Sequence, residues 1–284
     1  MRKDYNDDLL NRLKREELDI LKKFDKICTK YKLNYFVLYG TAIGTVRHQG
    51  FVPWDDDIDV GMFREDYEKF KLIAEKELGE IYRLSTPELE KFYSSNVVKI
   101  QKNGTKFIPP YAVGTPCDLG VHMDIFVFDK IPSNKKQRRR QKLLASLYSK
   151  LLFLRFFSEP EIDFGEPVKS ILGAGCKVIH CLLSALHVSP KWLYRKFEQN
   201  AKKYNWDETL DEYSTLQDPC VEKSSLKKSD VFPLKYMMFE DIEVPMMCGY
   251  DAFMRKWYGD YMQLPPIEKR VNHAPEIIDL GDGK

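Results

Sequence analysis

The residues best suited to chemistry lie between positions 35 and 62, where an acidic run carries Asp57 and Asp59. Apolar Ile58 and Val60 alternate with the two aspartates, so in a strand both carboxylates would project from one face. Unpaired carboxylates this close repel each other unless a cation lies between them. Mg²⁺ is a hard cation that takes oxygen ligands and completes its shell with water and substrate phosphate. We therefore expect a magnesium site here, with one or two ions and with Mn²⁺ able to replace Mg²⁺.

A glycine and a threonine, Gly40 and Thr41, precede this acidic run and follow an apolar segment at 35–39 that is expected to be a strand. A Gly-Thr turn lets the backbone approach a phosphate closely, and the helix expected after it offers free N–H groups at its N-terminus. A phosphate cradle followed by Asp-x-Asp is the layout of a nucleotidyltransferase-type phosphoryl-transfer site. The order of the two features predicts that Gly40 and Thr41 contact phosphate.

A calcium loop is the alternative for the acidic run, because its aspartates alternate and Asp66 falls near the last ligand position. Val60 stands where the sharp turn of such a loop needs glycine, and the terminal glutamate is replaced by aspartate. The apolar residues between the carboxylates favour a strand instead. We expect Asp55 and Asp56 to face solvent or to lie behind the metal ligands.

A second acidic position lies in VHMDIFVFD at 121–129, where Asp124 stands inside a run of apolar residues. A carboxylate in such a strand is unfavourable unless it is paired or bound to metal. Asp124 is therefore a candidate third ligand, and a structural aspartate is the alternative. Asp129 precedes Lys130 and Pro132 and is expected to be a turn residue.

The stretch LYGTAIGTVRHQGFVPWDDDIDVGM at 38–62 resembles the signature of the LicD family, which also includes the fukutin-related proteins. VHMDIFVFD at 121–129 and YGDYMQLPPIEKR at 258–270 fit the same family. The resemblance covers most of the chain, and the middle, about 132–230, fits least well.

This resemblance implies a nucleotidyltransferase-fold enzyme that moves a phospho-alcohol, phosphocholine above all, from a CDP-activated donor to a hydroxyl of a cell-surface glycan precursor, releasing CMP. The acceptor would be of teichoic acid, lipopolysaccharide or capsule type and could be lipid-linked. It also implies that Asp124 joins Asp57 and Asp59 as a catalytic metal ligand, or accepts the proton of the attacking hydroxyl. The alternatives are transfer of a nucleotidyl group from an NTP, or of a polyol phosphate from CDP-ribitol or CDP-glycerol.

Basic residues near these segments are the expected contacts of the donor phosphates. Arg47, His48 and Lys99 are candidates, because arginine grips phosphate in a bidentate manner and lysine acts as a point charge. Arg270 and His273 on the C-terminal tail are expected to close over the nucleotide, which rests mainly on the resemblance.

A choline donor also needs a site for its cation, usually the faces of aromatic rings beside a carboxylate. The chain has 16 Tyr, 17 Phe and 4 Trp, so most of these rings must belong to the core. Trp54, next to the acidic run, is the candidate for this role.

The elements that position these residues follow from apolar periodicity and from glycine and proline stops. Asn103-Gly104 predicts a hairpin that pairs 97–102 with 106–108. The expected helices are 6–31, 64–78, 191–204 and 250–258, and the expected strands are 82–85, 96–102, 121–128 and a hairpin within 230–244. We predict an α/β (α+β) protein with a mixed sheet of nucleotidyltransferase type flanked by helices.

The chain is expected to have three parts: a catalytic core at 1–131, a helical insertion at 132–228, and a segment at 229–284 that packs back on the core and closes the site. The insertion opens with a basic block that contains Lys135, Arg139 and Arg140 and continues into apolar segments. It is expected to form packed helices. Peripheral contact of 133–190 with an anionic membrane surface is the functional alternative.

Composition narrows the class of protein. The formal net charge is +2, which argues against a nucleic-acid binder. The six cysteines show no C-x-x-C pair, which favours free thiols. The N-terminus is too charged for a secretory signal, and we find no run close to the roughly 20 apolar residues of a membrane span. We therefore expect a cytoplasmic protein, peripheral on the inner face of the membrane if it binds there.

Overall fold

The computed structural model describes residues 6–160, 165, 167–270 and 272–281. Within them the central sheet has seven strands, with the path β1-β2-β6-β4-β3 and with β7 joining β6 to β8. β2 and β6 are parallel, and the other neighbours are antiparallel. The strands are β1 (Phe36–Val37), β2 (Asp59–Phe63), β3 (Tyr82–Ser85), β4 (Val98–Lys102), β6 (His122–Lys130), β7 (Glu212–Thr215) and β8 (Leu226–Lys227). The predicted mixed sheet flanked by helices is confirmed.

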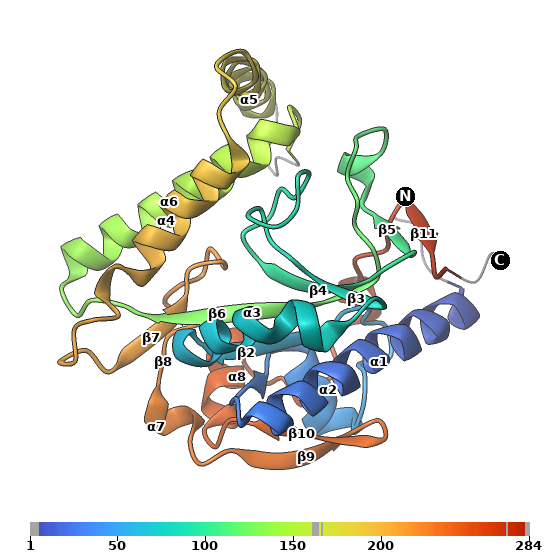
Figure 1. Ribbon diagram of the computed structural model, residues 1–284. Helices are drawn as coiled ribbons and strands as arrows, with labels where there is room; N and C mark the ends of the chain where they lie inside the picture. Colours follow the sequence, from blue (N-terminus) through green and yellow to red (C-terminus); the bar gives the residue numbers. More distant parts are fainter. Residues whose placement is uncertain (1–5, 161–164, 166, 271, 282–284) are drawn as a thin grey trace.

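Alternation along the strands gives the sheet two apolar faces. One face, which includes Val60 and Ile125, packs against α1 (Asp7–Tyr31) and α3 (Arg64–Leu78), and both helices lie along the sheet in Figure 1. The other face, which includes Phe63 and Phe126, packs against α8 (Tyr250–Tyr258). Asp59 and Asp124 have the same parity as the residues of this second face.

The remaining elements frame this core. α2 (Tyr39–His48) follows β1, and β9 (Lys235–Phe239) pairs with β10 (Ile242–Met246). β5 (Lys106–Ile108) pairs with β11 (Ile277–Asp279). Short helical segments are η1 (Pro110–Ala112), η2 (Lys202–Tyr204), α7 (Lys228–Val231) and η3 (Ile267–Lys269).

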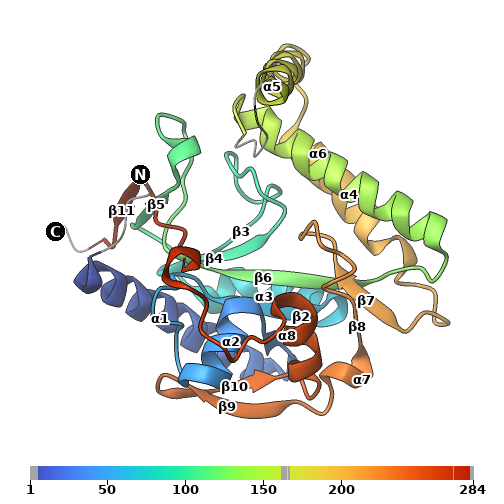
Figure 2. The same ribbon diagram turned by 180° about the vertical axis from the view of Figure 1, so that it is seen from behind.

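Three helices lie between β6 and β7: α4 (Lys135–Phe156), α5 (Val168–Ala185) and α6 (Pro190–Ala201). Figures 1 and 2 show α4 and α6 side by side, rising from one end of the sheet, with α5 at their far end. Buried hydrogen bonds join α4 to α6, since Asn200 Nδ2 donates to the Gln141 carbonyl at 2.8 Å. α4 and α6 pack together as expected, whereas α5 has no buried residue. The three-part division of the chain stays a prediction.

Several sequence-based predictions are wrong in detail. β1 ends at Val37 and α2 begins at Tyr39, so Gly40 and Thr41 lie in the first helical turn rather than in a separate turn. β2 begins at Asp59, which leaves Asp57 in the preceding loop. The predicted hairpin of β4 with β5 does not form. Gly104 does turn the chain with φ +75°, but β5 then pairs with β11 from the C-terminal tail.

Asp129 is not a turn residue. It lies in β6 with its side chain buried, and its carboxylate accepts bonds from Arg64 Nε at 2.8 Å and Arg64 Nη2 at 2.7 Å. Arg64 also binds Glu198 of α6 at 2.8 Å. This buried ion pair therefore ties the sheet to the helical insertion.

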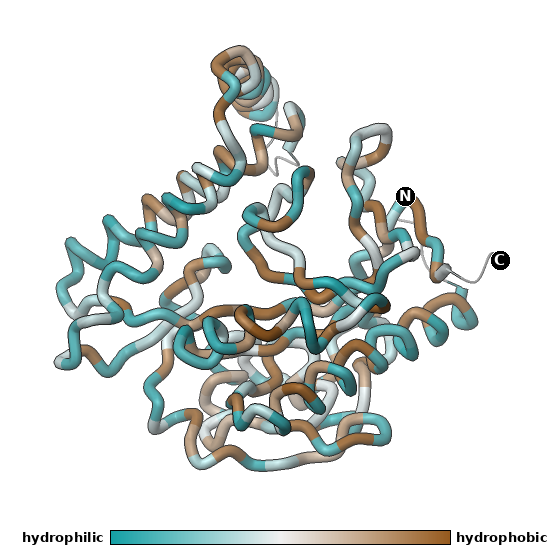
Figure 3. Tube along the Cα trace, in the orientation of Figure 1, coloured by the Kyte–Doolittle hydropathy of each residue, from teal (hydrophilic) through white to brown (hydrophobic). Residues whose placement is uncertain are grey.

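The statement that no segment approaches a membrane span also needs correction. Among the described residues, α5 is one helix long and apolar enough to cross a membrane by length and composition alone. None of its residues is buried. Figure 3 shows apolar residues along the sheet and again at α5, away from the core.

Candidate active site

Three neighbouring strands place three predicted site residues in one row. Asp59 of β2 lies opposite Asp124 of β6, and Asp124 lies opposite Lys99 of β4. Residues in register on adjacent strands project from the same face. Lys99 Nζ lies 2.5 Å from Asp124 Oδ1. The structure thus brings Asp59, Asp124 and Lys99 together, with Asp124 on the strand beside Asp59 as expected.

The loop before β2 adds more carboxylates to the end of this row. Potential ligand atoms of Asp55, Asp57 and His273 all lie within 4.8 Å of one another. His273 donates its backbone N–H to Asp56 Oδ1 at 2.8 Å, and its Nδ1 lies 3.5 Å from Asp57 Oδ2. Asp56 is buried, so the expectation that it faces solvent is wrong. The C-terminal tail, through His273, closes against the acidic loop.

Burial and mutual repulsion disfavour the charged forms of these acids. Burial, together with neighbouring Asp55, raises the pKa of Asp57 to about 8. Burial and neighbouring Asp57 and Asp124 hold the pKa of Asp59 well above its usual range. The interaction of the His273 imidazole with the Asp56 carboxylate raises the pKa of His273 to about 9. The cluster therefore holds more acidic groups than its neighbouring cations can balance, and in the metal-free protein part of them keep their protons.

A buried carboxylate from α1 extends this imbalance. Glu17 is 2% exposed, and its Oε2 has no hydrogen-bond partner among the described residues. Its pKa is raised well above the usual range by burial and then by Asp57 and Asp56. Hard oxygen donors in excess, one of them orphaned, fit a divalent cation such as Mg²⁺.

Gly40 and Thr41 support the acidic loop from behind. A Cβ on Gly40 would collide with the Asp55 carboxylate, so the glycine allows this close approach. Buried Thr41 accepts the Asp59 backbone N–H at 2.8 Å through its hydroxyl. In the part of the chain that is described, both residues hold β2 and its loop against α2, and neither lines the cavity of the site.

Arg47, His48 and Arg270 form a separate cluster around Trp54. The Arg47 guanidinium donates to the Tyr261 carbonyl at 2.5 Å and to His48 Nε2 at 2.9 Å. The Arg270 guanidinium carbon lies 4.7 Å from the centre of the Trp54 ring. The described lining of the cavity includes none of the four. The Arg270 guanidinium already lies over the Trp54 ring, which makes Trp54 a less suitable site for the choline cation.

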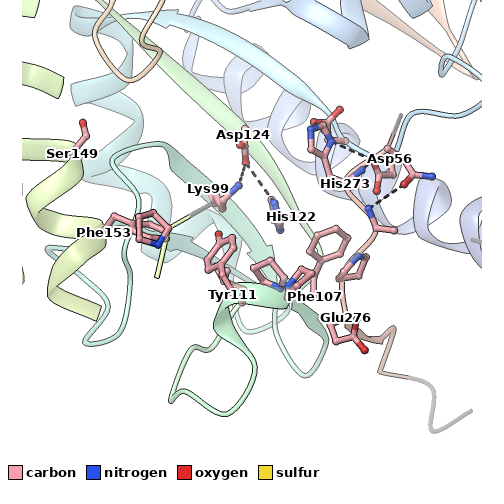
Figure 4. Close-up of a pocket in the computed structure, with 18 of the residues that line it drawn as sticks. Asp56, Lys99, Phe107, Tyr111, His122, Asp124, Ser149, Phe153, His273 and Glu276 are labelled. Carbon is pink, nitrogen blue, oxygen red and sulfur yellow. Dashed lines mark hydrogen bonds and ion pairs between the residues drawn. The ribbon is translucent and has the colours of Figure 1, made fainter. Parts of the chain in front are cut away.

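The cavity beside the carboxylate row has a volume of about 1210 Å³. Figure 4 shows Lys99, His122 and Asp124 near one another, His273 next to Asp56, and the aromatic residues Phe107, Tyr111 and Phe153 among the other lining residues. The insertion contributes Ser149 and Lys150 of α4 and Leu172 and Cys176 of α5, and the C-terminal tail contributes His273 and Glu276. Sheet, insertion and tail therefore meet at one site.

His122 is a site residue that the sequence analysis missed. Its Nδ1 lies 2.8 Å from the Gly120 carbonyl, which can only accept, so Nδ1 carries the proton and Nε2 keeps its lone pair. Nε2 lies 3.8 Å from Asp124 Oδ1. Burial lowers the pKa of His122 to about 4, so the imidazole is neutral near pH 7. The period of two that links His122 to Asp124 was the available signal.

Residues 32–143 match the model of the family described as LicD/FKTN/FKRP, nucleotidyltransferase domain. The chain is 32% identical over 264 residues to the lipopolysaccharide cholinephosphotransferase LicD of Haemophilus influenzae, covering 90% of this chain and 92% of that protein.

Two uncharacterised Rickettsia proteins match shorter stretches. RT0683 of Rickettsia typhi is 40% identical over 67 residues, covering 23% of this chain and 21% of that protein. RP689 of Rickettsia prowazekii is 43% identical over 47 residues, covering 16% and 18%. Because the chain is 32% identical to the Haemophilus protein over nearly the whole length of both, it belongs to the LicD family and is an enzyme with a nucleotidyltransferase domain.

Proposed function

We propose that the protein transfers phosphocholine from CDP-choline to a hydroxyl of a lipopolysaccharide-type glycan, in a reaction that needs Mg²⁺ and releases CMP. The row of Asp59, Asp124 and Lys99 beside a large cavity supports a phosphoryl-transfer site. The likeness to a lipopolysaccharide cholinephosphotransferase supports the transferred group and the acceptor. We also propose that it acts on the inner face of the cell membrane.

Asp57, Asp59 and Asp124 are the proposed ligands of one or two Mg²⁺ ions. A bound ion would neutralise charge on the transferred phosphoryl group and on the leaving CMP. The carboxylates of this chain hold and orient it, and Lys99 offers a further positive charge at the row. His273 beside Asp57 would add a nitrogen ligand once the incoming ion displaces its proton, which suits Mn²⁺ as a substitute.

The attacking hydroxyl must lose a proton during transfer. Asp124 and His122 both line the cavity, and the lone pair of His122 Nε2 lies close to Asp124. Either Asp124 Oδ or His122 Nε2 accepts the proton in the proposed mechanism. If Asp124 is engaged as a ligand, the neutral imidazole of His122 is the better acceptor.

The aromatic wall of the cavity is the proposed choline site. The Tyr111 and Phe153 ring centres lie 5.4 Å apart, and Phe107 and the carboxylate of Glu276 line the same cavity. Aromatic faces with a nearby carboxylate recognise quaternary ammonium groups. This wall replaces Trp54 as our candidate, because Trp54 is covered by Arg270.

Removal of one ring should weaken choline binding selectively. We expect Tyr111→Ala to raise the KM for CDP-choline about fivefold, since one cation–π contact contributes about 1 kcal/mol. The KM for CDP-glycerol should change little. Steady-state kinetics with both donors checks this, with Tyr236→Ala, an exposed tyrosine on β9, as the control. Equal effects on both donors would remove Tyr111 from the choline site.

Metal binding should stabilise the protein in a pH-dependent way. The pKa of Asp57 rises from 3.8 to about 8 on folding, so the folded protein keeps a proton that the unfolded chain releases. The stability from this group is present below about pH 4 and is lost as the pH rises through about 8. We therefore expect the Tm of the metal-free protein to fall between about pH 6 and pH 8.

Mg²⁺ binds the ionised form, so its addition should raise the Tm more at about pH 8 than at about pH 6. Thermal unfolding with EDTA or MgCl₂ checks this, and Asp57→Asn is the control that removes the group. If Mg²⁺ does not change the Tm at either pH value, the metal assignment is contradicted.

The reaction class is tested by its product. The purified protein is incubated with CDP-choline and lipopolysaccharide, and separately with CTP and phosphocholine. CMP formed only with the first pair is the expected result, and EDTA should abolish it. Pyrophosphate formed from CTP would instead identify a nucleotidyltransferase.

A further inference from the structure

The apolar face of α5 is exposed to solvent instead of packing against the core. Five apolar side chains fall on one face of this helix at 3.6 residues per turn, and all five are exposed. They are Val168, Ile171, Val178, Leu182 and Leu186, the last at the end of the helix. We call these residues the apolar stripe. A helix that serves only as scaffold directs its apolar face at the core, whereas α5 presents this face to solvent.

The polar side of α5 is the side that meets the rest of the protein. His180 Nδ1 lies 2.8 Å from the Leu154 carbonyl of α4, and Cys176 lines the cavity. Ile171 and Leu182 are 67% and 55% exposed. A contiguous apolar surface of this kind marks a site of contact with another apolar phase.

Charge indicates which partner covers it. From Pro167 to Phe197 every charged side chain is basic: Lys169, Lys177, Lys191, Arg195 and Lys196. Two of them are paired, Lys177 with Glu159 at 2.9 Å and Arg195 with Glu88 at 3.5 Å. The positive charge offered to a partner therefore comes from Lys169, Lys191 and Lys196. Trp192, at the start of α6, is also exposed. Exposed apolar residues, lysines, arginines and a tryptophan are the composition of a segment that lies in the headgroup region of an anionic bilayer.

We infer that the apolar stripe of α5 and the start of α6 dock onto an anionic bilayer surface, with the stripe inserted among the lipids. At 18 residues α5 is near the lower limit for crossing a membrane. Its polar side, with Lys169, Lys177 and His180, favours a helix that lies in the interface.

Docking of α5 on a bilayer would explain how the enzyme reaches a lipid-linked acceptor, and this part of the inference rests on the proposed function. Leu172 and Cys176 of α5 line the same cavity as Asp57 and Asp124. A glycan carried on a lipid would then be held at the bilayer by its acyl chains while its sugar enters the cavity beside α5. The helix would bring the carboxylate row to the membrane surface.

The inference also replaces the earlier expectation about the basic block. Lys135 to Arg140 begin α4, whereas α5 lies beyond its other end (Figures 1 and 2). Arg138 is already engaged, bonding the Pro132 carbonyl at 2.9 Å and pairing with Glu212. The basic block therefore does not share a surface with the apolar stripe.

Vesicle sedimentation tests the inference without using the reaction. The full-length protein is mixed with vesicles of phosphatidylcholine alone or with phosphatidylglycerol added. The wild type should sediment with the anionic vesicles and much less with the neutral ones. Ile171→Glu/Leu182→Glu should weaken this binding at least about tenfold. Leu72→Glu, on an α3 side chain that is 87% exposed, is the matched control and should bind like the wild type.

The Tm of each variant is measured as well, and it should not change because the substituted side chains are exposed. Absence of binding to anionic vesicles, or equal binding by the double variant, would overturn the inference. A wild type that elutes as a dimer, with a monomeric double variant, would assign the stripe to self-association instead. CMP release with a delipidated glycan acceptor is measured for the double variant as well. If the variant loses vesicle binding but releases CMP at the wild-type rate, membrane docking and the proposed reaction are shown to be separate properties.

Discussion

Asp59→Asn and Asp124→Asn are each expected to lower the rate of phosphocholine transfer by at least about 10³-fold while leaving the fold intact. Each variant removes a proposed oxygen ligand from the carboxylate row, and electrostatic stabilisation of the transferred group depends on that row. The Asp59 side chain is buried among other acids. Its neutral replacement should therefore keep the Tm unchanged or raise it. Initial rates of CMP release and thermal unfolding are measured together.

Asp129→Asn is the matched control, because Asp129 lies on the same strand as Asp124 and is buried, as Asp59 is. It pairs with Arg64 rather than facing the cavity. We expect this variant to lose stability but to keep the activity of each folded molecule. Near wild-type rates in Asp59→Asn or Asp124→Asn would contradict the ligand assignment.

Arg64→Met is expected to lower the free energy of unfolding by roughly 3 to 5 kcal/mol, the effect of leaving a buried charge without its partner. The guanidinium joins Asp129 of β6 to Glu198 of α6, and the substitution leaves both carboxylates in place. Urea denaturation measures the loss.

The double variant Arg64→Met/Asp129→Leu should recover part of this stability, because two apolar side chains replace the buried charges. A loss below about 1 kcal/mol in Arg64→Met would show that the ion pair does not hold the insertion to the sheet. No recovery in the double variant would point to another cause for the loss.

Local signals predicted helices with accurate ends. α3 and α8 have the bounds expected from apolar periodicity, and each is followed by a glycine, Gly79 and Gly259, at positive φ. The resemblance to the LicD family supplied the neighbouring strands of Asp59 and Asp124. Both kinds of information are contained in short stretches of sequence.

Long-range pairing was not predictable in this way. Asn103-Gly104 is a strong local turn signal, but the strand after it pairs with β11, about 170 residues later. Asp129 seemed to belong to a turn because its partner Arg64 lies 65 residues earlier. In both cases the deciding contact comes from a distant part of the chain.

The sequence indicated the carboxylates of the candidate site but few of the other residues that line its cavity. Lys99, a predicted phosphate contact, and His273, predicted to close over the nucleotide, both lie beside the carboxylates. Arg47, His48 and Arg270 instead gather around Trp54, because the tail and the end of α2 pack together there. The aromatic wall arises where the β5 region meets α4, two segments that the sequence does not show to be neighbours.

The most direct test follows the label of CDP-choline radiolabelled in its choline methyl groups, incubated with lipopolysaccharide and the purified protein. We predict that label enters the glycan and that CMP appears in equal molar amounts with Mg²⁺, and that neither forms with EDTA or with Asp59→Asn. Labelled glycan formed at the same rate in EDTA, or by Asp59→Asn, would contradict a metal-dependent transfer at the carboxylate row.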